Sequence, residues 1–233
     1  MSKFIDRITG KKKIFREEEI HYKKSFSQDG EDMILHSIFD DLGGRNNGFF
    51  IDVGALHPYR FSNTAFFYDK GWNGINIEPT PDAIAIFNNV RMRDINLNYG
   101  VNNVEGELSF YIFDEPALNS FSKELSAQRV ATTHYKLIDT VTVPVSRLET
   151  ILDKYLPAGQ HIDFMSVDVE GLDLLVLKSN NWDKYIPDFL FVEEIIDIEN
   201  LSAAEIHNFL KHKGYVFIAK TPRTLLYRHQ STF

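Results

Sequence analysis

The sequence predicts an α/β protein with a doubly wound, mostly parallel seven-stranded sheet and a C-terminal antiparallel hairpin. Three observations carry this prediction. Short buried-strand patterns alternate with helical patterns along the chain, as in sheets built from strand–helix–strand units. The first two core strands each end in a carboxylate, Asp52 and Glu78, as is typical of the ligand-binding edge of such a sheet. Two final strand patterns, 215–220 and 225–228, flank the hairpin signal Thr-Pro-Arg-Thr.

Composition limits the class of protein. The chain has 233 residues, of which 43% are hydrophobic, enough for one domain with a substantial core. A formal charge of −8 argues against a nucleic-acid partner. The absence of cysteine excludes disulfides, thiolate zinc sites and cysteine nucleophiles. No signal peptide and no uncharged run long enough to span a bilayer is visible, so a cytoplasmic protein without a membrane span is expected.

The first half of the chain begins with a helical extension, expected over residues 1–45, in which residues 1–24 are loosely attached. Core strands are expected at 48–53 and 74–78, with a helix over 64–70 between them. Pro81 marks the start of the next helix. The pattern of that helix predicts that it buries Ile84, Ile86 and Phe87.

A third strand is expected over 94–101, followed by a β insert over 105–145 that could cover a site as a lid. Strand and helix patterns then alternate again to the hairpin: helices over 147–155, 171–178 and 201–213, and strands over 162–168 and 189–194. Neither an internal repeat nor a second domain is visible, so residues 1–233 are predicted to form a single domain.

The turn after the first strand narrows the ligand. A dinucleotide fingerprint needs G-x-G-x-x-G, whose backbone wraps a pyrophosphate. Here Gly54 is followed by Ala, Leu, His and Pro, which disfavours an NAD-dependent oxidoreductase. A nucleoside without phosphates fits this turn better, and S-adenosylmethionine (SAM) is the common one.

An ordered set of motifs resembles the FkbM family of SAM-dependent O-methyltransferases. The segments are Ser27–Asp32, Phe50–Ala55, Gly71–Pro79, Arg93–Asn98, Ser166–Gly171 and Leu177–Asn180. Together they cover roughly residues 25 to 228 in the expected order. The resemblance implies a class I methyltransferase fold that methylates a hydroxyl of a carbohydrate, such as a nucleotide-activated sugar or a surface-glycan sugar.

The expected cofactor site lies at the carboxyl ends of these strands. Gly54 would let the turn approach the cofactor without a Cβ clash. Asp52 would hold the methionine ammonium, and Glu78 would accept both ribose hydroxyls. The structural alternative is that Asp52 caps the following turn and that Glu78 is simply exposed at the end of its strand. By position or family analogy the expected cofactor-binding set also includes Ala55, Pro79 and Asp168, and it places Asn96 and Asn98 near adenine. Gln28 and Glu31 are expected to close over the cofactor, although they could equally be helix-cap groups.

Activation of the acceptor needs a general base or a metal ion, because a sugar hydroxyl is a poor nucleophile while it keeps its proton. Four carboxylates are expected at one edge of the sheet, namely Asp168, Glu170, Glu193 and Glu194. Two alternatives stay open. Asp168 with Glu193 or Glu194 binds Mg²⁺ or Mn²⁺, or a single carboxylate or His57 is the base. Neighbouring strand residues point to opposite faces, so Glu193 and Glu194 can face the same way only if the strand has ended.

The acceptor site has weaker signals. Its expected residues are Tyr59, Arg60 and Asn63 after the cofactor turn, Asn119 and Ser120 in the insert, and Arg223 in the hairpin. The arginines could hold a sugar diphosphate, or they could simply be solvated. Two rival functions are methylation of a non-sugar natural product and a non-catalytic SAM-binding module; the intact carboxylate set favours an enzyme. A homodimer is left open.

Overall fold

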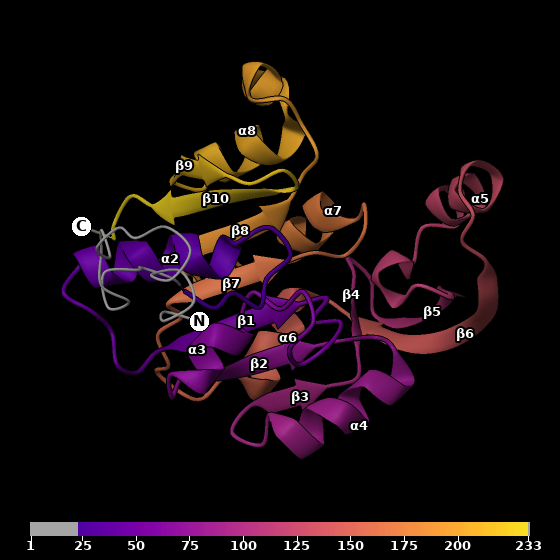
Figure 1. The fold of residues 1–233 in the computed structure, drawn as a ribbon, viewed down its shortest axis with the longest axis horizontal. Coiled ribbons are helices and arrows are strands. Elements are labelled where there is room, and N and C mark those ends of the chain that lie inside the picture. Colours follow the sequence, from indigo (N-terminus) through magenta and orange to yellow (C-terminus); the bar gives the residue numbers. More distant parts are fainter. Residues whose placement is uncertain (1–22, 233) are drawn as a thin grey trace, which may run out of the picture.

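The computed structural model of the chain describes residues 23–232 (Figure 1). The loosely attached extension expected over residues 1–24 lies almost wholly outside the described residues. None of the helices in the described part of the chain is long and apolar enough to cross a bilayer.

A seven-stranded sheet forms the centre of the fold, in the order β3-β2-β1-β7-β8-β10-β9. Its strands are β1 Phe49–Val53, β2 Asn73–Ile77, β3 Ile95–Leu97, β7 Phe164–Val167, β8 Phe189–Glu193, β9 Tyr215–Lys220 and β10 Thr224–His229. The strands from β3 to β8 pair in parallel, whereas β10 runs antiparallel to both β8 and β9. The predicted fold class is therefore confirmed.

Side chains alternate between the two faces of the sheet along each strand. Both faces carry buried apolar side chains, and helices cover both of them. On one face, Ile51 and its equivalents pack against α6 Leu148–Tyr155, α7 Asp173–Lys178 and α8 Glu205–His212, the last preceded by a short 3₁₀ helix, η3 Ile198–Ala203. On the other, Phe50 and its equivalents pack against α2 Glu31–Asp41 and α3 Ala65–Asp69. Helix α2, expected within the N-terminal extension, is thus part of the core.

Helix α4, Pro81–Val90, begins with its proline in the first turn, as predicted. Ile84 and Phe87 pack with Ala55, but Ile86 is 44% exposed, so the prediction that it is buried was wrong. Residues three apart share a helix face, whereas residues two apart lie on nearly opposite sides.

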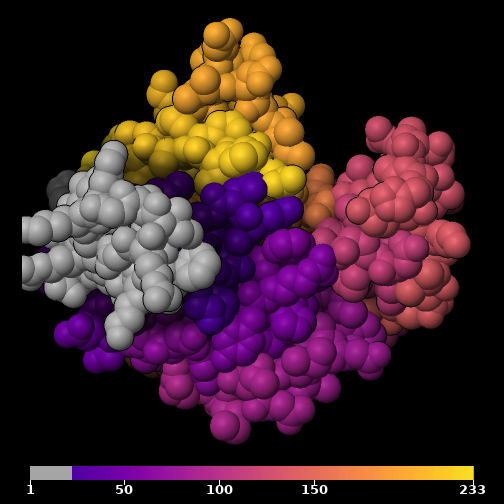
Figure 2. Space-filling view, viewed as in Figure 1, coloured from indigo at the N-terminus to yellow at the C-terminus, as the bar shows by residue number. Residues whose placement is uncertain are grey.

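The predicted third strand is divided between two sheets. β3 ends at Leu97, and β4 Gly100–Val101 joins a second, three-stranded sheet in the order β4-β6-β5. This second sheet is completed by β5 Gly106–Phe113 and β6 Leu137–Ser146. We call residues 100–146 the insert; it also carries a 3₁₀ helix, η2 Pro116–Leu118, and helix α5 Lys123–Thr132, which the sequence patterns did not reveal. Figure 2 shows the insert as a lobe beside the body of the protein.

Candidate active site

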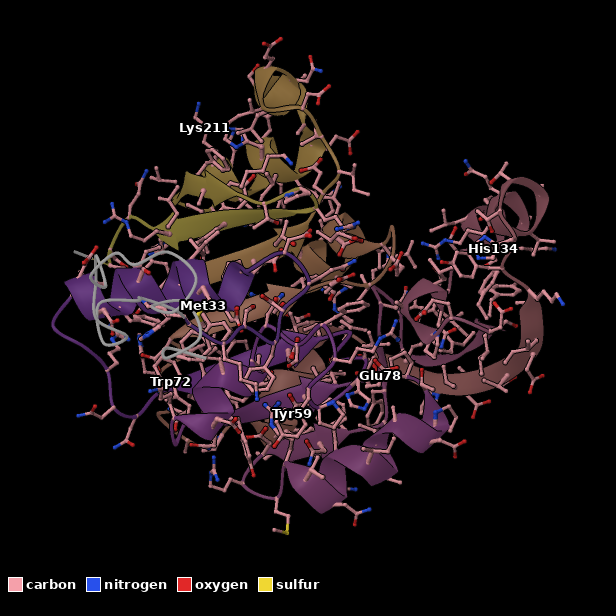
Figure 3. The ribbon with its side chains drawn as sticks, in the orientation of Figure 1. Met33, Tyr59, Trp72, Glu78, His134 and Lys211 are labelled. Carbon is pink, nitrogen blue, oxygen red and sulfur yellow. The ribbon has the colours of Figure 1, made fainter. Side chains whose placement is uncertain are left out.

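A cavity lies between the carboxyl ends of β1, β2 and β7 and the insert. It has a volume of about 720 Å³, including the space open to solvent at its mouth. The core contributes Val53, Gly54, Leu56, Phe61, Ile77, Glu78, Pro79, Asp168, Val169 and Glu170, and Gln28 adds to the rim. The 99–121 segment supplies a mostly apolar wall: Tyr99, Gly100, Val101, Phe110, Pro116, Ala117, Asn119 and Phe121. In Figure 3, Glu78 lies where the core sheet meets the insert.

Glu78 is held rigidly at the end of β2. Its Oε2 accepts a hydrogen bond from the Leu56 amide at 2.8 Å, and its Oε1 accepts one from the Thr80 amide at 2.8 Å. Burial raises the pKa of its carboxyl group, while these hydrogen bonds oppose the rise. A carboxylate oxygen has two lone pairs, so each oxygen retains one acceptor position for a ligand hydroxyl.

The two asparagines expected near adenine have other partners. Asn98 braces the turn after β2, because its Nδ2 donates to the carbonyl oxygens of Glu78 and Pro79 at 2.9 and 3.0 Å. Asn96 lies in a hydrogen-bonded group with Asn76 and Asn88. Neither residue lines the cavity. The apolar wall of the insert is the surface that faces the end of β2 instead.

Gly54 is required for a reason that differs from the expected one. Its φ is 80°, and a Cβ at this position would occupy the space of the Asp168 carbonyl oxygen. The close approach is thus to the end of β7, although Gly54 also lines the cavity.

Asp52 and Glu31, both expected to contact the cofactor, are bonded within the protein. Asp52 accepts from Thr64 Oγ1 at 2.8 Å and faces the α3 side of the sheet. Burial raises its pKa to about 6, against the effects of Thr64 and Arg91. Glu31 accepts from the Asp29 amide and from Thr221 Oγ1, and so joins α2 to the hairpin. Neither of these two carboxylates lines the cavity, and neither does Ala55, which packs under α4.

Asp168 and Glu170, which line the cavity, form a carboxylate cluster with Glu193, which lies outside the lining. One carboxylate oxygen of each lies within 4.8 Å of the others. Burial, followed by the charges of Glu193 and Glu170, raises the pKa of Asp168 well above its usual value. Burial and Glu193 raise the pKa of Glu170 to about 7, opposed by Arg129. Three carboxylates so close together repel one another, and either a bound proton or a bound cation would reduce that repulsion.

Glu194 does not belong to this cluster, contrary to its expected role as a ligand. Its amide donates to the Arg223 carbonyl oxygen at 2.8 Å. Burial and the nearby Glu205 raise its pKa, and its own charge contributes to the raised pKa of Tyr227. Neighbouring strand residues point to opposite faces, so Glu193 lies beside Asp168 and Glu170, whereas Glu194 lies on the α8 side. Glu170 takes the third place in the cluster.

His57 has the geometry of a turn residue. Its Nδ1 accepts hydrogen bonds from the amides of Tyr59 and Arg60 at 3.1 and 3.0 Å. A neutral imidazole that accepts at Nδ1 carries its proton on Nε2, which leaves no free acceptor for a substrate proton. Burial and Arg60 also lower its pKa. This arrangement favours the carboxylate cluster over His57 as the base.

The expected acceptor residues are dispersed. Asn119 lines the cavity, and Ser120 donates to the Glu170 carbonyl oxygen at 3.0 Å. Arg60 forms two hydrogen bonds with Glu115 of the insert, at 2.8 and 2.9 Å. Of the six expected residues only Asn119 is in the lining; among the others, Asn63 donates to Ser166 Oγ, Arg223 donates to Asp29, and Tyr59 packs on Phe26.

Two residues near the cluster were missed by the sequence patterns. Asp173, in the first turn of α7, accepts from the amides of Val169 and Gly171 at 3.1 and 3.2 Å and shapes the turn after β7. Arg129 on α5 donates to Glu170. An acid two residues beyond Gly171 was a readable signal for Asp173, whereas Arg129 lies on a helix without an apolar stripe.

A second group of ligand-type side chains, His161, Asp163 and Asp188, lies at the opposite edge of the sheet. Arg45 already pairs with both of its aspartates. This group is an ion-pair cluster joining the 45–49 loop to the starts of β7 and β8.

The strand order, the antiparallel terminal hairpin and a cavity at the carboxyl edge define a class I methyltransferase architecture. Residues 52–217 match the methyltransferase FkbM domain, and the chain belongs to this family of methyltransferases. The family implies SAM as the methyl donor.

No curated protein matches the chain. Seven chains of solved structures do match. One is the precorrin-6y C5,15-methyltransferase from Geobacter metallireducens GS-15, at 10% identity and a TM-score of 0.42 over 91% of this chain and 94% of that one. A likeness at this level carries no argument about the substrate.

Proposed function

We propose that the protein is a SAM-dependent O-methyltransferase that methylates a hydroxyl group of a carbohydrate, either in a nucleotide-activated sugar or in a surface glycan. The single observation that supports this proposal most is the pairing of two carboxylate sites across one cavity. Glu78 stands at the end of β2, and the cluster of Asp168, Glu170 and Glu193 stands at the ends of β7 and β8. One site suits a nucleoside, and the other suits activation of a hydroxyl.

The residues at the β2 end fit the methyl donor. Glu78 offers a fixed, buried carboxylate for the ribose hydroxyls, and the apolar wall that includes Tyr99 and Phe121 offers a surface for adenine. The single glycine turn suits a ligand without phosphates. When bound, SAM supplies a methyl group already made electrophilic by its sulfonium.

The carboxylate cluster is the candidate proton acceptor. In the proposed reaction a new bond forms between the acceptor oxygen and the methyl carbon, the carbon–sulfur bond breaks, and the hydroxyl proton passes to the Asp168–Glu193 pair. A carboxyl group whose pKa is raised is a stronger base, once ionised, than an ordinary carboxylate, and the pKa values of both Asp168 and Glu193 are raised.

A divalent cation is the second way in which this cluster could act. Oxygen ligands from Asp168, Glu170 and Glu193 would suit Mg²⁺ or Mn²⁺, which would lower the pKa of a bound acceptor hydroxyl. The cation would also offset the repulsion among these carboxylates. In this set of ligands Glu170 takes the place expected for Glu194.

The proposal is tested by calorimetric titration with SAM and by incubation with SAM and a panel of nucleotide sugars. A mass gain of one CH₂ unit by an acceptor, lost with Asp168→Asn, is the expected result. Failure of SAM to bind would overturn the proposal. Methylation of non-sugar hydroxyls alone would move the enzyme to the natural-product class.

A further inference from the structure

The turn after β7 has an unusual backbone. Glu170 has a φ of 57° and Gly171 has a φ of 91°. A residue other than glycine rarely adopts this left-handed backbone conformation unless its surroundings fix it. The same turn presents Asp168 and Glu170 to the cavity. Whatever holds the turn therefore sets the position of the candidate catalytic carboxylates.

The turn is held from two sides. From the core, Asp173 accepts hydrogen bonds from the amides of Val169 and Gly171. From the insert, Ser120 Oγ donates to the Glu170 carbonyl oxygen at 3.0 Å, and Arg129 donates to the Glu170 carboxylate. Half of the side-chain hydrogen bonds to this turn thus come from the insert.

Arg129 also organises the insert itself. Its Nη1 donates to the carbonyl oxygen of Leu118, while its Nη2 reaches Glu170. A planar guanidinium can make both bonds at once, and a lysine ammonium at the end of a flexible stem is a poor replacement. The Arg129 side chain is 13% exposed and that of Glu170 is 22% exposed, so the pair is largely shielded from water.

The two walls joined by this contact belong to one cavity. Pro116, Ala117, Asn119 and Phe121 line it from the insert, and the turn after β7 lines it from the core. We propose that Arg129 is a positioning residue that latches the insert onto the Glu170 turn, closing the cavity and fixing the acceptor side of the site. This inference rests on the proposed function for its consequence in catalysis, but the latch itself is a property of the fold.

Amide hydrogen exchange of the full-length chain tests the latch directly. In Arg129→Ala, amides in residues 116–132 and 169–171 should exchange about tenfold faster than in the wild type, as expected for loss of a charge-assisted hydrogen bond, while β1 and β7 stay unchanged. Gln128→Ala, at an exposed position on the same helix, is the control and should match the wild type. Arg129→Lys should fall between the two and replaces the alanine variant if that one does not fold.

Kinetics separate positioning from general support. Arg129→Ala should raise the KM for the acceptor about tenfold or more and weaken SAM binding less, because the contact lies on the acceptor side. Equal exchange in the Arg129 variants and the wild type would overturn the latch, and so would faster exchange throughout the core sheet. If SAM does not bind the wild type, the proposed function fails while the exchange comparison still decides the latch.

Discussion

The carbonyl oxygen of Asp168 occupies the space that a Cβ on Gly54 would need. Gly54, which follows β1, and the backbone of Asp168, which follows β7, are therefore packed as a unit. A substitution on the donor side of the cavity must disturb the acceptor side.

Gly54→Ala should destabilise the protein by at least about 2 kcal/mol, because it adds a clash to a left-handed backbone. Urea unfolding measures this loss. Gly159→Ala is the matched control, since Gly159 has a φ of 74° with nothing within 4 Å of a Cβ. It should cost about 1 kcal/mol from the backbone alone. Equal losses in the two variants would show that the Asp168 carbonyl yields without cost.

Glu78→Gln should weaken SAM binding by about tenfold to a hundredfold, since a neutral amide replaces one acceptor oxygen by a donor. The Leu56 or the Thr80 amide also loses its partner. Isothermal calorimetry gives the dissociation constant. Asp82→Asn, an exposed change on α4, should leave it unaltered. Unchanged affinity in Glu78→Gln would remove Glu78 from the cofactor site.

Methyl transfer should require a higher pH than an ordinary carboxylate base would. Burial and mutual repulsion raise the pKa of Asp168, and burial raises that of Glu193. The base form is lost as the pH falls below these raised values, so the acid limb of the kcat profile should lie well above pH 4. Glu193→Gln removes one charge and should shift that limb to lower pH in any residual activity. A limb near pH 4 in the wild type would argue against the Asp168–Glu193 pair as the base.

Asp52→Asn should change the pH dependence of stability. The pKa of Asp52 is raised from 3.8 to about 6, so the folded state holds this proton more tightly than the unfolded state. Its contribution is fully present below the unfolded pKa and is lost as the pH rises to about 6. The variant should therefore gain relative to the wild type across this window, by up to about 3 kcal/mol. Urea unfolding at several pH values, with Asp82→Asn as the control, measures the gain, and a constant difference between wild type and variant would refute it.

Mg²⁺ or Mn²⁺ should raise the melting temperature at pH 8, where the carboxylate cluster is most fully ionised. Asp168→Asn and Glu193→Gln should abolish this rise. Glu194→Gln alters the neighbouring residue on the opposite face and should retain it. Scanning calorimetry with and without the cation provides the measurement. Full methyl transfer after exhaustive chelation would count against a catalytic metal.

The core sheet could be predicted because its strands are continuous buried runs bounded by turn residues. Helix α5 could not, because its sequence has no apolar stripe and its buried residue is Ser126. The strand over 94–101 reads as one β-rich run, and only the pairing of Gly100 with Val145 shows that its second half has left the core.

For the candidate site, strand ends identified Glu78 and Asp168, since topology brings such ends to one edge. Side-chain direction was harder. Asp52 and Glu194 follow the same strand-end logic but face away from the cavity, and the partners of His57 are backbone amides that carry no residue-type signal. Arg129 reaches Glu170 across 41 positions of sequence, so no local pattern could join them.

The second sheet has a consequence for how such proteins can diversify. The insert begins with β4 and ends with β6, and these two strands lie side by side, because Gly100 pairs with Val145 and Val101 with Ser146. Both ends of the insert therefore meet the rest of the protein at one place. A segment anchored in this way can be lengthened, shortened or exchanged, so the cavity wall that it supplies can change in evolution while the carboxylates at the ends of the core strands are kept.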